Sequence, residues 1–394
     1  MRSELIAERS ELSPGVHSST GRAKPTSPER KRGDRPEGAD RNLKTAEIRV
    51  PCRPSFLTSH LSLLTFTLLL PVLVIGCKED KGAAAPTVTL YSSVDEPFAR
   101  EVIAAFKQQT GIDVKLKLDS EAGKTTGLVN LIRSQKDRPL ADVFWSSELF
   151  NTIKMAREGL LAEYRPPAEG IPERYRDPAG RWTAFGLRAR VLAWNPEQLK
   201  REEVPATWRD IANPRWTGKL AVANPQFGTT RGHFAAMLAL WGEEQYSQFL
   251  TDLNKVLNGR LMDGNTTTAA VVARGEYLLG ATDTDDVCVR QNRKEPIDMV
   301  YPDMGDGGML LIPNSVGLIT GGPNPEAAKK LIDFLTSPET ERMLARSDSR
   351  NIPVRESLRK ELNAPLVPET KLSFDAIADA MDKAIEMAGK QLTR

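Results

Sequence analysis

The sequence predicts a two-lobed α/β protein with parallel-rich sheets, and three observations lead to this fold class. From residue 87, and again from residue 219, short apolar stretches alternate with amphipathic stretches of helical length. Such alternation indicates strand–helix–strand units and a parallel sheet covered on both faces. A longer extended stretch, residues 181–196, lies between the two series, and another, residues 309–320, comes after the second series. Two α/β lobes joined by two extended crossovers are typical of a hinged binding protein.

Each expected element follows from its residue pattern. DVKLKL alternates strictly, which predicts a strand, and Gly111 ends the helix before it. We assign residues 87–196 and 301–352 to lobe 1, and residues 197–300 and 353–394 to lobe 2. The expected strands are 87–93, 113–118, 141–147, 219–225 and 276–282, and the expected helices are 96–111, 123–135, 149–161, 229–242, 327–337, 339–347 and 373–388.

The N-terminal part of the chain has the composition of a targeting segment. Residues 1–55 are rich in Pro, Gly, Ser and charge, which predicts a disordered leader, an unusually long n-region or a true translation start downstream of Met1. Residues 56–77 are expected to be a lipoprotein signal, because their apolar stretch ends in VIGC, which resembles the bacterial lipobox with its lipid on Cys77. A plain secretory signal or a single anchor helix is the alternative. Residues 78–86 are expected to be a tether.

Charge, cysteine and histidine content exclude several function classes. The chain has 54 Lys and Arg against 52 Asp and Glu, and the positive excess lies in the leader, so the remainder offers no basic field for nucleic acid. Cleavage before Cys77 leaves Cys288 as a lone thiol, expected to be reduced and buried, without a disulfide framework. His233 is then the only histidine, expected at the surface, so zinc sites rich in histidine and Ser-His-Asp chemistry are poorly supplied.

One motif suggests nucleotide chemistry. GKTT, residues 123–126, follows an expected strand and begins an expected helix, as a phosphate-binding loop does. The first glycine of that motif would stand at position 118, where this chain has Leu118. A nucleotide-using enzyme therefore stays only an outside alternative, and we expect a protein without catalytic activity.

The stretch GATDTDDVCVR places three carboxylates, Asp283, Asp285 and Asp286, directly after an apolar run. One interpretation is helix capping, because acids at a helix start satisfy free backbone N–H groups and suit the helix dipole. The other is a ligand site, because open α/β folds bind ligands where a strand ends and a helix begins. Acids crowded at such a place favour a cationic ligand.

Four stretches resemble the ferric-iron-binding proteins of bacterial ABC transporters. They are YSSVDEPFAREVIAAFKQQTGIDV, ADVFWSSELFNTIKMAREGLLAEY, FGLRARVLAWNP and PEAAKKLIDFLTSPETERMLA, and the resemblance extends over about residues 87–360. It implies the class II periplasmic-binding-protein fold, with the ligand in a cleft between the lobes and closure by hinge bending. It also implies an ABC permease as partner and a monomer in the periplasm or at the cell exterior, anchored to the membrane by its lipid.

The resemblance implies a site made of oxygen ligands from both lobes. The family commonly has two adjacent tyrosines at the strand-to-helix turn of the second lobe, where this chain has Asp285 and Asp286. Thr229 and Asn265 match positions that hold an anion beside the iron, and Arg188 could do likewise. The expected metal ligands are Asp285, Asp286, Asp95 and Glu148, and the other expected ligand-binding residues are Ser92, Ser93, Ser146, Ser147, Arg188, Thr229, Thr230, Asn265 and Asp283.

The replacement of both tyrosines leaves the ligand open. Aspartates are hard oxygen donors that suit ferric iron or another hard cation, and equally the ammonium group of an organic ligand. Ferric iron or a ferric complex is the first expectation, as a transported ligand and not as a cofactor. Another small solute, such as a phosphonate, a sulfate-like anion or a polyamine, is the second.

Overall fold

The computed structural model describes residues 86–119, 123, 125–364 and 367–392, and all of them belong to one unit of the chain, residues 48–394. The predicted leader, the lipoprotein signal with Cys77 and nearly all of the tether lie outside the described residues. Within the described ranges, no helix is long and apolar enough to cross a membrane.

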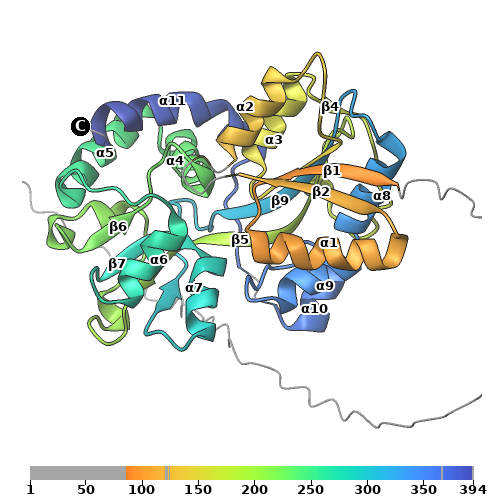
Figure 1. Ribbon diagram of the computed structural model, residues 1–394. Coiled ribbons are helices and arrows are strands. Elements are labelled where there is room, and N and C mark those ends of the chain that lie inside the picture. Colours follow the sequence, from red (N-terminus) through yellow and green to blue (C-terminus); the bar gives the residue numbers. More distant parts are fainter. Residues whose placement is uncertain (1–85, 120–122, 124, 365–366, 393–394) are drawn as a thin grey trace, which may run out of the picture. The chain divides into compact units, whose positions relative to one another are not determined.

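A nine-stranded mixed sheet runs through the described part of the chain (Figure 1). The strand order is β2-β1-β3-β9-β5-β7-β6, with β4 paired to β9 and β8 paired to β5. The strands are β1 (Thr87–Ser92), β2 (Asp113–Leu118), β3 (Val143–Ser146), β4 (Leu161–Ala162), β5 (Thr183–Trp194), β6 (Leu220–Val222), β7 (Leu279–Asp283), β8 (Asp298–Val300) and β9 (Leu311–Ile319).

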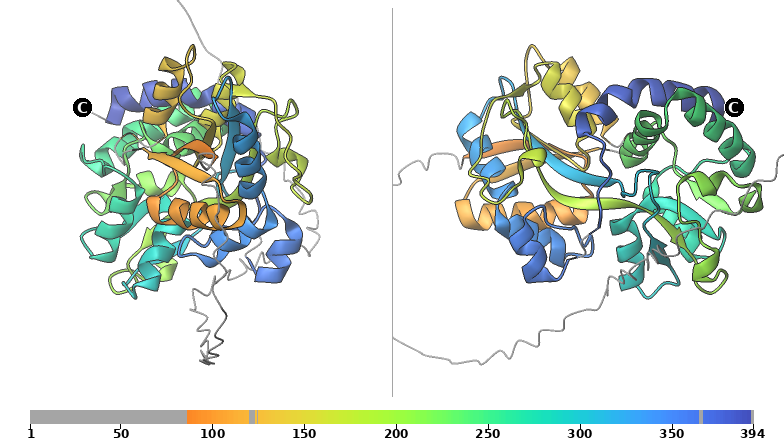
Figure 2. Two further views of the ribbon diagram at one scale, coloured as in Figure 1. Left: turned by 45° about the vertical axis from the view of Figure 1, so that its right-hand side comes forward. Right: turned by 180° about the vertical axis from the view of Figure 1, so that it is seen from behind.

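The pairing confirms the predicted α/β fold class. β1 pairs in parallel with β2 and β3 at one end of the sheet, and β6 pairs in parallel with β7 at the other. The two long strands between them, β5 and β9, run antiparallel to their neighbours and correspond to the predicted crossovers. Helices lie on both faces of each half (Figure 2).

β5 connects the two halves. Its first part, residues 183–189, pairs with β9, and its last part, residues 190–194, pairs with β7. All twelve of its residues are buried. The pairing with β9 shifts register around Gly186, whose φ of 55° lies in the left-handed region that glycine adopts without strain. The strand therefore leaves one half and enters the other near residue 190.

The helices cover the sheet on both sides. α1 contains Pro97 in its first turn and ends at Gly111 with φ 71°, as its sequence predicts. Short 3₁₀ turns occur at Glu173–Tyr175, Arg201–Glu203, Arg209–Ala212 and Pro214–Trp216. The helices are α1 (Glu96–Thr110), α2 (Thr126–Ser134), α3 (Phe150–Arg157), α4 (Gly228–Trp241), α5 (Glu243–Leu257), α6 (Asn265–Ala273), α7 (Thr284–Asn292), α8 (Pro325–Leu335), α9 (Pro338–Arg346), α10 (Glu356–Leu362) and α11 (Phe374–Leu392).

Two apolar clusters make up the core. One lies between β1, β3, α1 and α8 and includes Phe106, Trp145 and Leu331. The other is larger and continues from α2 and α3 into α4, α5 and α11. Cys288 on α7 is 1% exposed, which confirms the predicted burial of this residue.

α11 contacts elements of both halves. Its apolar face packs on α4, and Tyr246 of α5 donates to the carbonyl of Ala384 at 3.0 Å. Asp382 on its polar face accepts from Lys154 of α3 at 2.5 Å and from Arg231 of α4 at 3.3 Å. α10 contacts α9, beside the first series of elements, although the sequence-based division assigns residues 353–394 to lobe 2.

α3 and α4 approach each other closely at Gly232. A Cβ atom at this position would lie 2.3 Å from the ring of Phe150, so something must move to accept it. We expect Gly232→Ala to lower the free energy of unfolding by about 1–3 kcal/mol, the usual cost of overpacking a core. Urea denaturation of the two proteins measures this difference.

Gly389→Ala is the matched control, because Gly389 lies inside α11 and its added Cβ would meet only the amide end of the Gln226 side chain, at 3.1 Å. Alanine is the better helix former by about 1 kcal/mol, so this variant should be as stable as the wild type or more stable. Equal denaturation midpoints for Gly232→Ala and the wild type would contradict the close contact.

Candidate functional site

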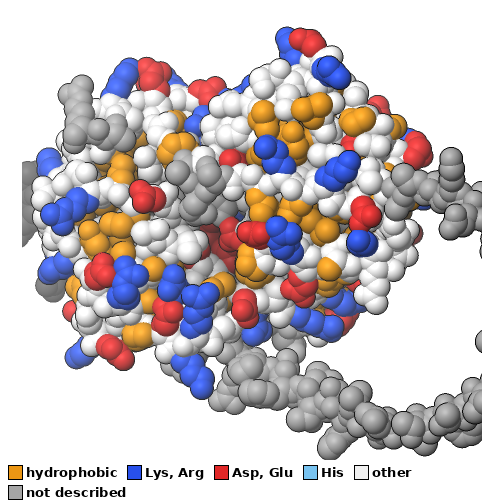
Figure 3. Space-filling model, viewed as in Figure 1, with side chains coloured by type: hydrophobic (Ala, Val, Ile, Leu, Met, Phe, Trp, Pro, Cys, Tyr) orange, Lys and Arg blue, Asp and Glu red, His pale blue; other side chains and the backbone are white. Residues whose placement is uncertain are grey.

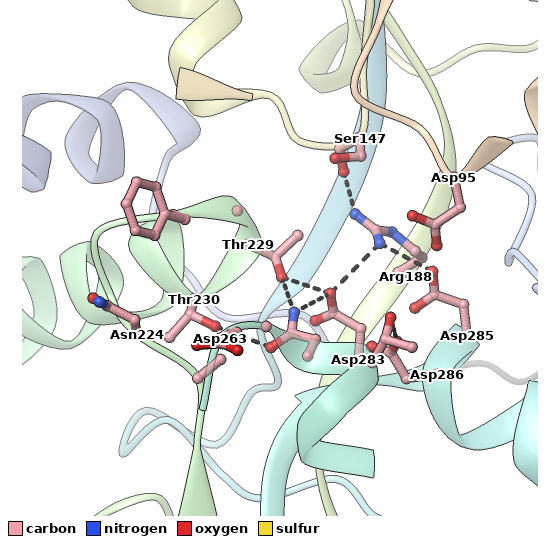
Figure 4. Close-up of a pocket in the computed structure, with 16 residues that line it drawn as sticks. Asp95, Ser147, Arg188, Asn224, Thr229, Thr230, Asp263, Asp283, Asp285 and Asp286 are labelled. Atoms are coloured by element: carbon pink, nitrogen blue, oxygen red, sulfur yellow. Dashed lines mark hydrogen bonds and ion pairs between the residues drawn. The ribbon is translucent and has the colours of Figure 1, made fainter. Parts of the chain in front are cut away.

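A polar pocket lies where β5 passes from one half to the other (Figure 4). Water-sized molecules can occupy about 30 Å³ of it, which is room for about two waters. Acidic side chains gather near the middle of the face seen in Figure 3. The lining residues are Asp95, Ser147, Arg188, Ala223, Asn224, Phe227, Gly228, Thr229, Thr230, Asp263, Gly264, Asn265, Thr266, Asp283, Asp285 and Asp286.

Asp283, the last residue of β7, is surrounded by hydrogen-bond donors. It is 1% exposed, and it accepts from Arg190 Nη1 at 2.7 Å, Thr229 Oγ1 at 2.5 Å and Asn265 Nδ2 at 3.0 Å. Burial alone would raise the pKa of Asp283, but the charges of Arg190 and Arg188 and the Thr229 hydroxyl bring it below the usual value. Asp283 is therefore an ionised group whose oxygens are already occupied.

Asp285, in the first turn of α7, keeps one oxygen open. Its Oδ2 accepts from Arg188 Nη1 at 3.0 Å, whereas its Oδ1 has no hydrogen-bond partner among the described residues. The side chain is 5% exposed. Burial, opposed by Arg188 and reinforced by Asp283 and Asp95, raises the pKa of Asp285. A buried acceptor without a donor is costly, so Asp285 is the carboxylate that would gain most from a cationic ligand.

Asp286 completes the acidic turn. Its two oxygens accept from the hydroxyls of Thr266 and Thr282, each at 2.9 Å. One oxygen from each of Asp283, Asp285 and Asp286 lies within 4.8 Å of the others, a spacing that could hold a metal ion. Asp283 stands at the N-cap position of α7 but makes no capping hydrogen bond from its side chain. The structure thus gives Asp283 a role other than the capping that its position suggests.

Arg188 of β5 connects the acidic turn to the other half of the protein. Its Nη1 contacts Asp285 and, at 3.5 Å, Asp283, while its Nη2 donates to the carbonyl oxygen of Ser147, which follows β3. Burial disfavours its charge, but Asp285 and Asp283 raise the pKa of Arg188 above its ordinary value. Arg188 therefore stays protonated at every physiological pH.

Arg188 and Asp285 also line a second, smaller space. That space measures about 10 Å³ and shares Asp95, Ser147, Arg188 and Asp285 with the first pocket. The other residues around the second space are Val94, Phe98, Asn314, Leu344, Ser349 and Asn351.

Two helix starts lie directly beside the acids. α4 and α6 begin at the pocket without a side-chain cap and without an acidic residue in the first turn. Helix starts with free backbone N–H groups and a positive dipole end attract anions. Thr229 and Thr230 add hydroxyl groups, and the amide of Asn265 connects them, because its Oδ1 accepts from Thr230 at 3.0 Å and its Nδ2 donates to Thr229 at 2.6 Å.

Most of the residues predicted from sequence meet in this pocket. Asp95, Ser147, Arg188, Thr229, Thr230, Asn265, Asp283, Asp285 and Asp286 all line it.

Ser92, Ser93, Ser146 and Glu148 do not line the pocket. The hydroxyl of Ser93 accepts from the backbone N–H of Ser147 at 2.9 Å and supports that loop from behind. Glu148 is 1% exposed and accepts from the backbone N–H groups of Phe150 at 2.6 Å and Asn151 at 3.1 Å, so it occupies the start of its own helix, α3. Burial, despite these N–H donors, raises the pKa of Glu148.

Sequence reasoning missed Arg190 and misjudged His233. Arg190 is fully buried behind the pocket wall. His233 was expected at the surface but is 1% exposed, because its Nδ1 accepts from Arg190 Nε at 3.3 Å and its ring lies 4.1 Å from that of Trp208. The signal for Arg190 was present in the sequence, since residues 188 and 190 of a strand share one face.

Comparison with known proteins gives a family match. The model of the family of bacterial extracellular solute-binding proteins matches residues 129–378. The iron uptake protein A1 of Synechocystis sp. is 24% identical over 316 residues, which cover 73% of this chain and 86% of that protein. A putative 2-aminoethylphosphonate-binding periplasmic protein of Salmonella typhimurium is 27% identical over 287 residues, which cover 69% of this chain and 80% of that protein.

A solved structure shows the same fold. The crystal structure of iron-bound HitA from Pseudomonas aeruginosa superposes with a TM-score of 0.69 at 23% identity, over 77% of this chain and 99% of that one. The likeness confirms the predicted two-lobed, periplasmic-binding-protein fold.

The buried His233 should affect stability in acid. Burial, and then the charge of Arg190, lower the pKa of His233 well below its ordinary value, which is about 6.5 in an unfolded chain. Below that pH the unfolded state binds a proton that the folded state does not bind. The free energy of unfolding should therefore fall as the pH falls from about 6.5, by up to about 1.4 kcal/mol per pH unit.

Urea denaturation of the wild type and of His233→Asn between pH 5 and 8 measures this effect. Carboxylates titrate in both proteins, so the difference between the two curves isolates the imidazole. The wild type should lose stability more steeply below pH 6.5, and the curves should run parallel above pH 7.5. Equal slopes in the acid range would mean that His233 takes up its proton in the folded state.

Proposed function

Because the chain belongs to the family of bacterial extracellular solute-binding proteins, we propose that it captures a small solute in the pocket between its halves and delivers it to an ABC permease. The proposed ligand is ferric iron or a ferric complex, held as a cation by Asp285, Asp286 and Asp95 with an anion on the starts of α4 and α6. The name of the Synechocystis relative, an iron uptake protein, supports this ligand.

The observation that carries the proposal is the open oxygen of Asp285. It is a buried carboxylate with one unpartnered oxygen, and Asp95 and Asp286 line the same small space. Counted with Arg190 behind the wall, five aspartates face two arginines, so the pocket has an excess of negative charge that favours a cation. Carboxylate oxygens are ligands that hard cations such as ferric iron accept.

A second candidate is an aminoalkylphosphonate. The acids of the pocket match an ammonium group, and the uncapped starts of α4 and α6 beside them match a phosphonate. The Salmonella relative is named for a ligand of this class. Both candidates place a positive charge at Asp285 and a negative charge near Thr229.

The two candidates can be separated by titration. Ferric citrate and 2-aminoethylphosphonate are each added to the protein while the melting temperature and the binding heat are followed, since a ligand that binds only the folded state stabilises it. Sulfate, a polyamine and ATP serve as comparison ligands. Stabilisation by ferric citrate and not by citrate alone supports iron, whereas stabilisation by neither ferric citrate nor 2-aminoethylphosphonate would contradict the proposed ligand classes.

Asp285→Asn should weaken binding of the ligand that stabilises the wild type by about ten- to a hundredfold, because contacts to charged groups are worth about 1.5–3 kcal/mol. The fold should stay intact, since asparagine keeps the shape and removes a buried charge. Calorimetric titration gives the affinities of Asp285→Asn, Asp286→Asn and the double variant. Asp298→Asn, at the exposed first residue of β8, is the control and should bind as the wild type does.

Glu148→Gln tests the predicted role of Glu148 as a metal ligand against its place at the start of α3. A ligand role predicts a loss of affinity comparable to that of Asp285→Asn, whereas a purely capping role predicts a loss of stability without a loss of affinity.

For the acidic turn, the deciding variant is the double variant Asp285→Asn/Asp286→Asn. If its affinity equals that of the wild type, the acidic turn is not part of the binding site.

We further propose that the mature protein begins at Cys77 and is held to the membrane by lipid on that residue. The support is the apolar stretch before VIGC, and a single lipid site needs no spanning helix. Metabolic labelling with a fatty acid should mark the wild type and not Cys77→Ala, which should also leave the membrane fraction. Labelling that persists in the variant would contradict lipid attachment at this residue.

A further inference from the structure

Arg190 contacts three of the elements that form the pocket, although it does not line the pocket itself. Its Nη1 donates to Asp283 Oδ1 at 2.7 Å, to Asn265 Oδ1 at 3.2 Å and to Thr229 Oγ1 at 3.3 Å. These partners stand at the end of β7 before α7, at the first position of α6 and in the first turn of α4. One guanidinium thus joins the three helix starts that face the ligand space.

His233 fixes the orientation of this guanidinium. Its Nδ1 accepts from Arg190 Nε at 3.3 Å, so the imidazole is neutral and carries its proton on Nε2. The ring is held in place by Trp208, in an edge contact at 4.1 Å between ring centres. His233 is one turn after Thr229 on α4, so the helix that supplies a pocket hydroxyl also supplies the group that aligns Arg190.

We propose that Arg190 is a positioning residue for ligand binding: it fixes Thr229, Asn265 and Asp283 as one wall of the pocket, and His233 holds Arg190 in place. This inference rests on the proposed function and deepens it, because it gives the three acids of the turn, Asp283, Asp285 and Asp286, different roles. Asp283 is the internal partner of Arg190 and anchors the wall. Asp285, whose Oδ1 has no hydrogen-bond partner among the described residues, is the carboxylate of the turn that is most open to the ligand. The neighbouring Arg188 differs, because it lines the pocket and contacts the facing half through Ser147.

Four variants test the proposal. Arg190→Met removes all four contacts, and the double variant Arg190→Met/Asp283→Asn removes the buried charge that the single variant leaves unpaired, so that it folds where the single one fails. Both should bind ferric citrate, or 2-aminoethylphosphonate if that is the ligand, at least tenfold more weakly than the wild type. His233→Leu should lose severalfold in affinity, whereas His233→Asn, whose Oδ1 can replace Nδ1 as acceptor, should recover most of it.

The matched control is a buried arginine pair outside the pocket, Arg355 with Glu341. Arg355 is 2% exposed, its Nη1 lies 2.8 Å from Glu341 Oε2, and neither residue lines the pocket. Arg355→Met/Glu341→Gln should reduce stability but keep affinity within about twofold of the wild type. Wild-type affinity in Arg190→Met/Asp283→Asn, or equal loss in the control, would overturn the proposal.

Hydrogen exchange separates this inference from the proposed function. In the unliganded protein, backbone amides at the starts of α4, α6 and α7 should exchange faster in Arg190→Met/Asp283→Asn than in the wild type, while the start of α9 should not change. If the wild type binds neither probe, the proposed ligand classes fail and this comparison alone decides the positioning role. Unchanged exchange at the three helix starts would then overturn it.

Discussion

The pocket depends on a constraint in β5, which is a member of both halves of the sheet. Its pairing partner changes from β9 to β7 between residues 189 and 190, and strand geometry places residues 188 and 190 on the same face. Two arginines therefore enter the space between the halves side by side. Asp283 and Asp285 of the acidic turn pair with these two guanidinium groups, Arg188 in the pocket and Arg190 behind its wall.

Burial of these arginines requires the acids. Transfer of an ion out of water costs several kcal/mol even after the protein relaxes, and an arginine cannot give up its proton to avoid this cost. Asp283 compensates both guanidinium groups and is itself satisfied by hydroxyl and amide donors. Asp285 compensates Arg188 with one oxygen only. The stability of the wall and the readiness of the site for a cation thus come from two different carboxylates in one turn.

The sequence predicts the order of elements well, because hydrophobic period and glycine positions are local signals. The placement of Asp95 near Ser147 could also be predicted, since residues that follow the parallel strands β1 and β3 meet at one edge of the sheet. The acidic turn follows β7 in the other half, and its place beside them was expected only from the family resemblance. The contacts of Arg188 and Arg190 with Asp283 could not, because they join residues 95 and 93 positions apart. Glu148 bonds to the start of its own helix, α3, and the choice between that and the pocket depends on side-chain rotation that no local pattern records.

Arg188 couples the two charges of the proposed ligand. Its guanidinium donates to Asp285 and to the carbonyl oxygen of Ser147, in the loop after β3. A cation that takes over Asp285 releases part of this guanidinium, which can then turn to an anion at the starts of α4 and α6. By thermodynamic reciprocity, an anion that attracts Arg188 makes Asp285 more available to a cation. Under the proposed function, a ligand that carries both charges, such as a ferric ion with its anion or an aminoalkylphosphonate, is therefore favoured over either ion alone.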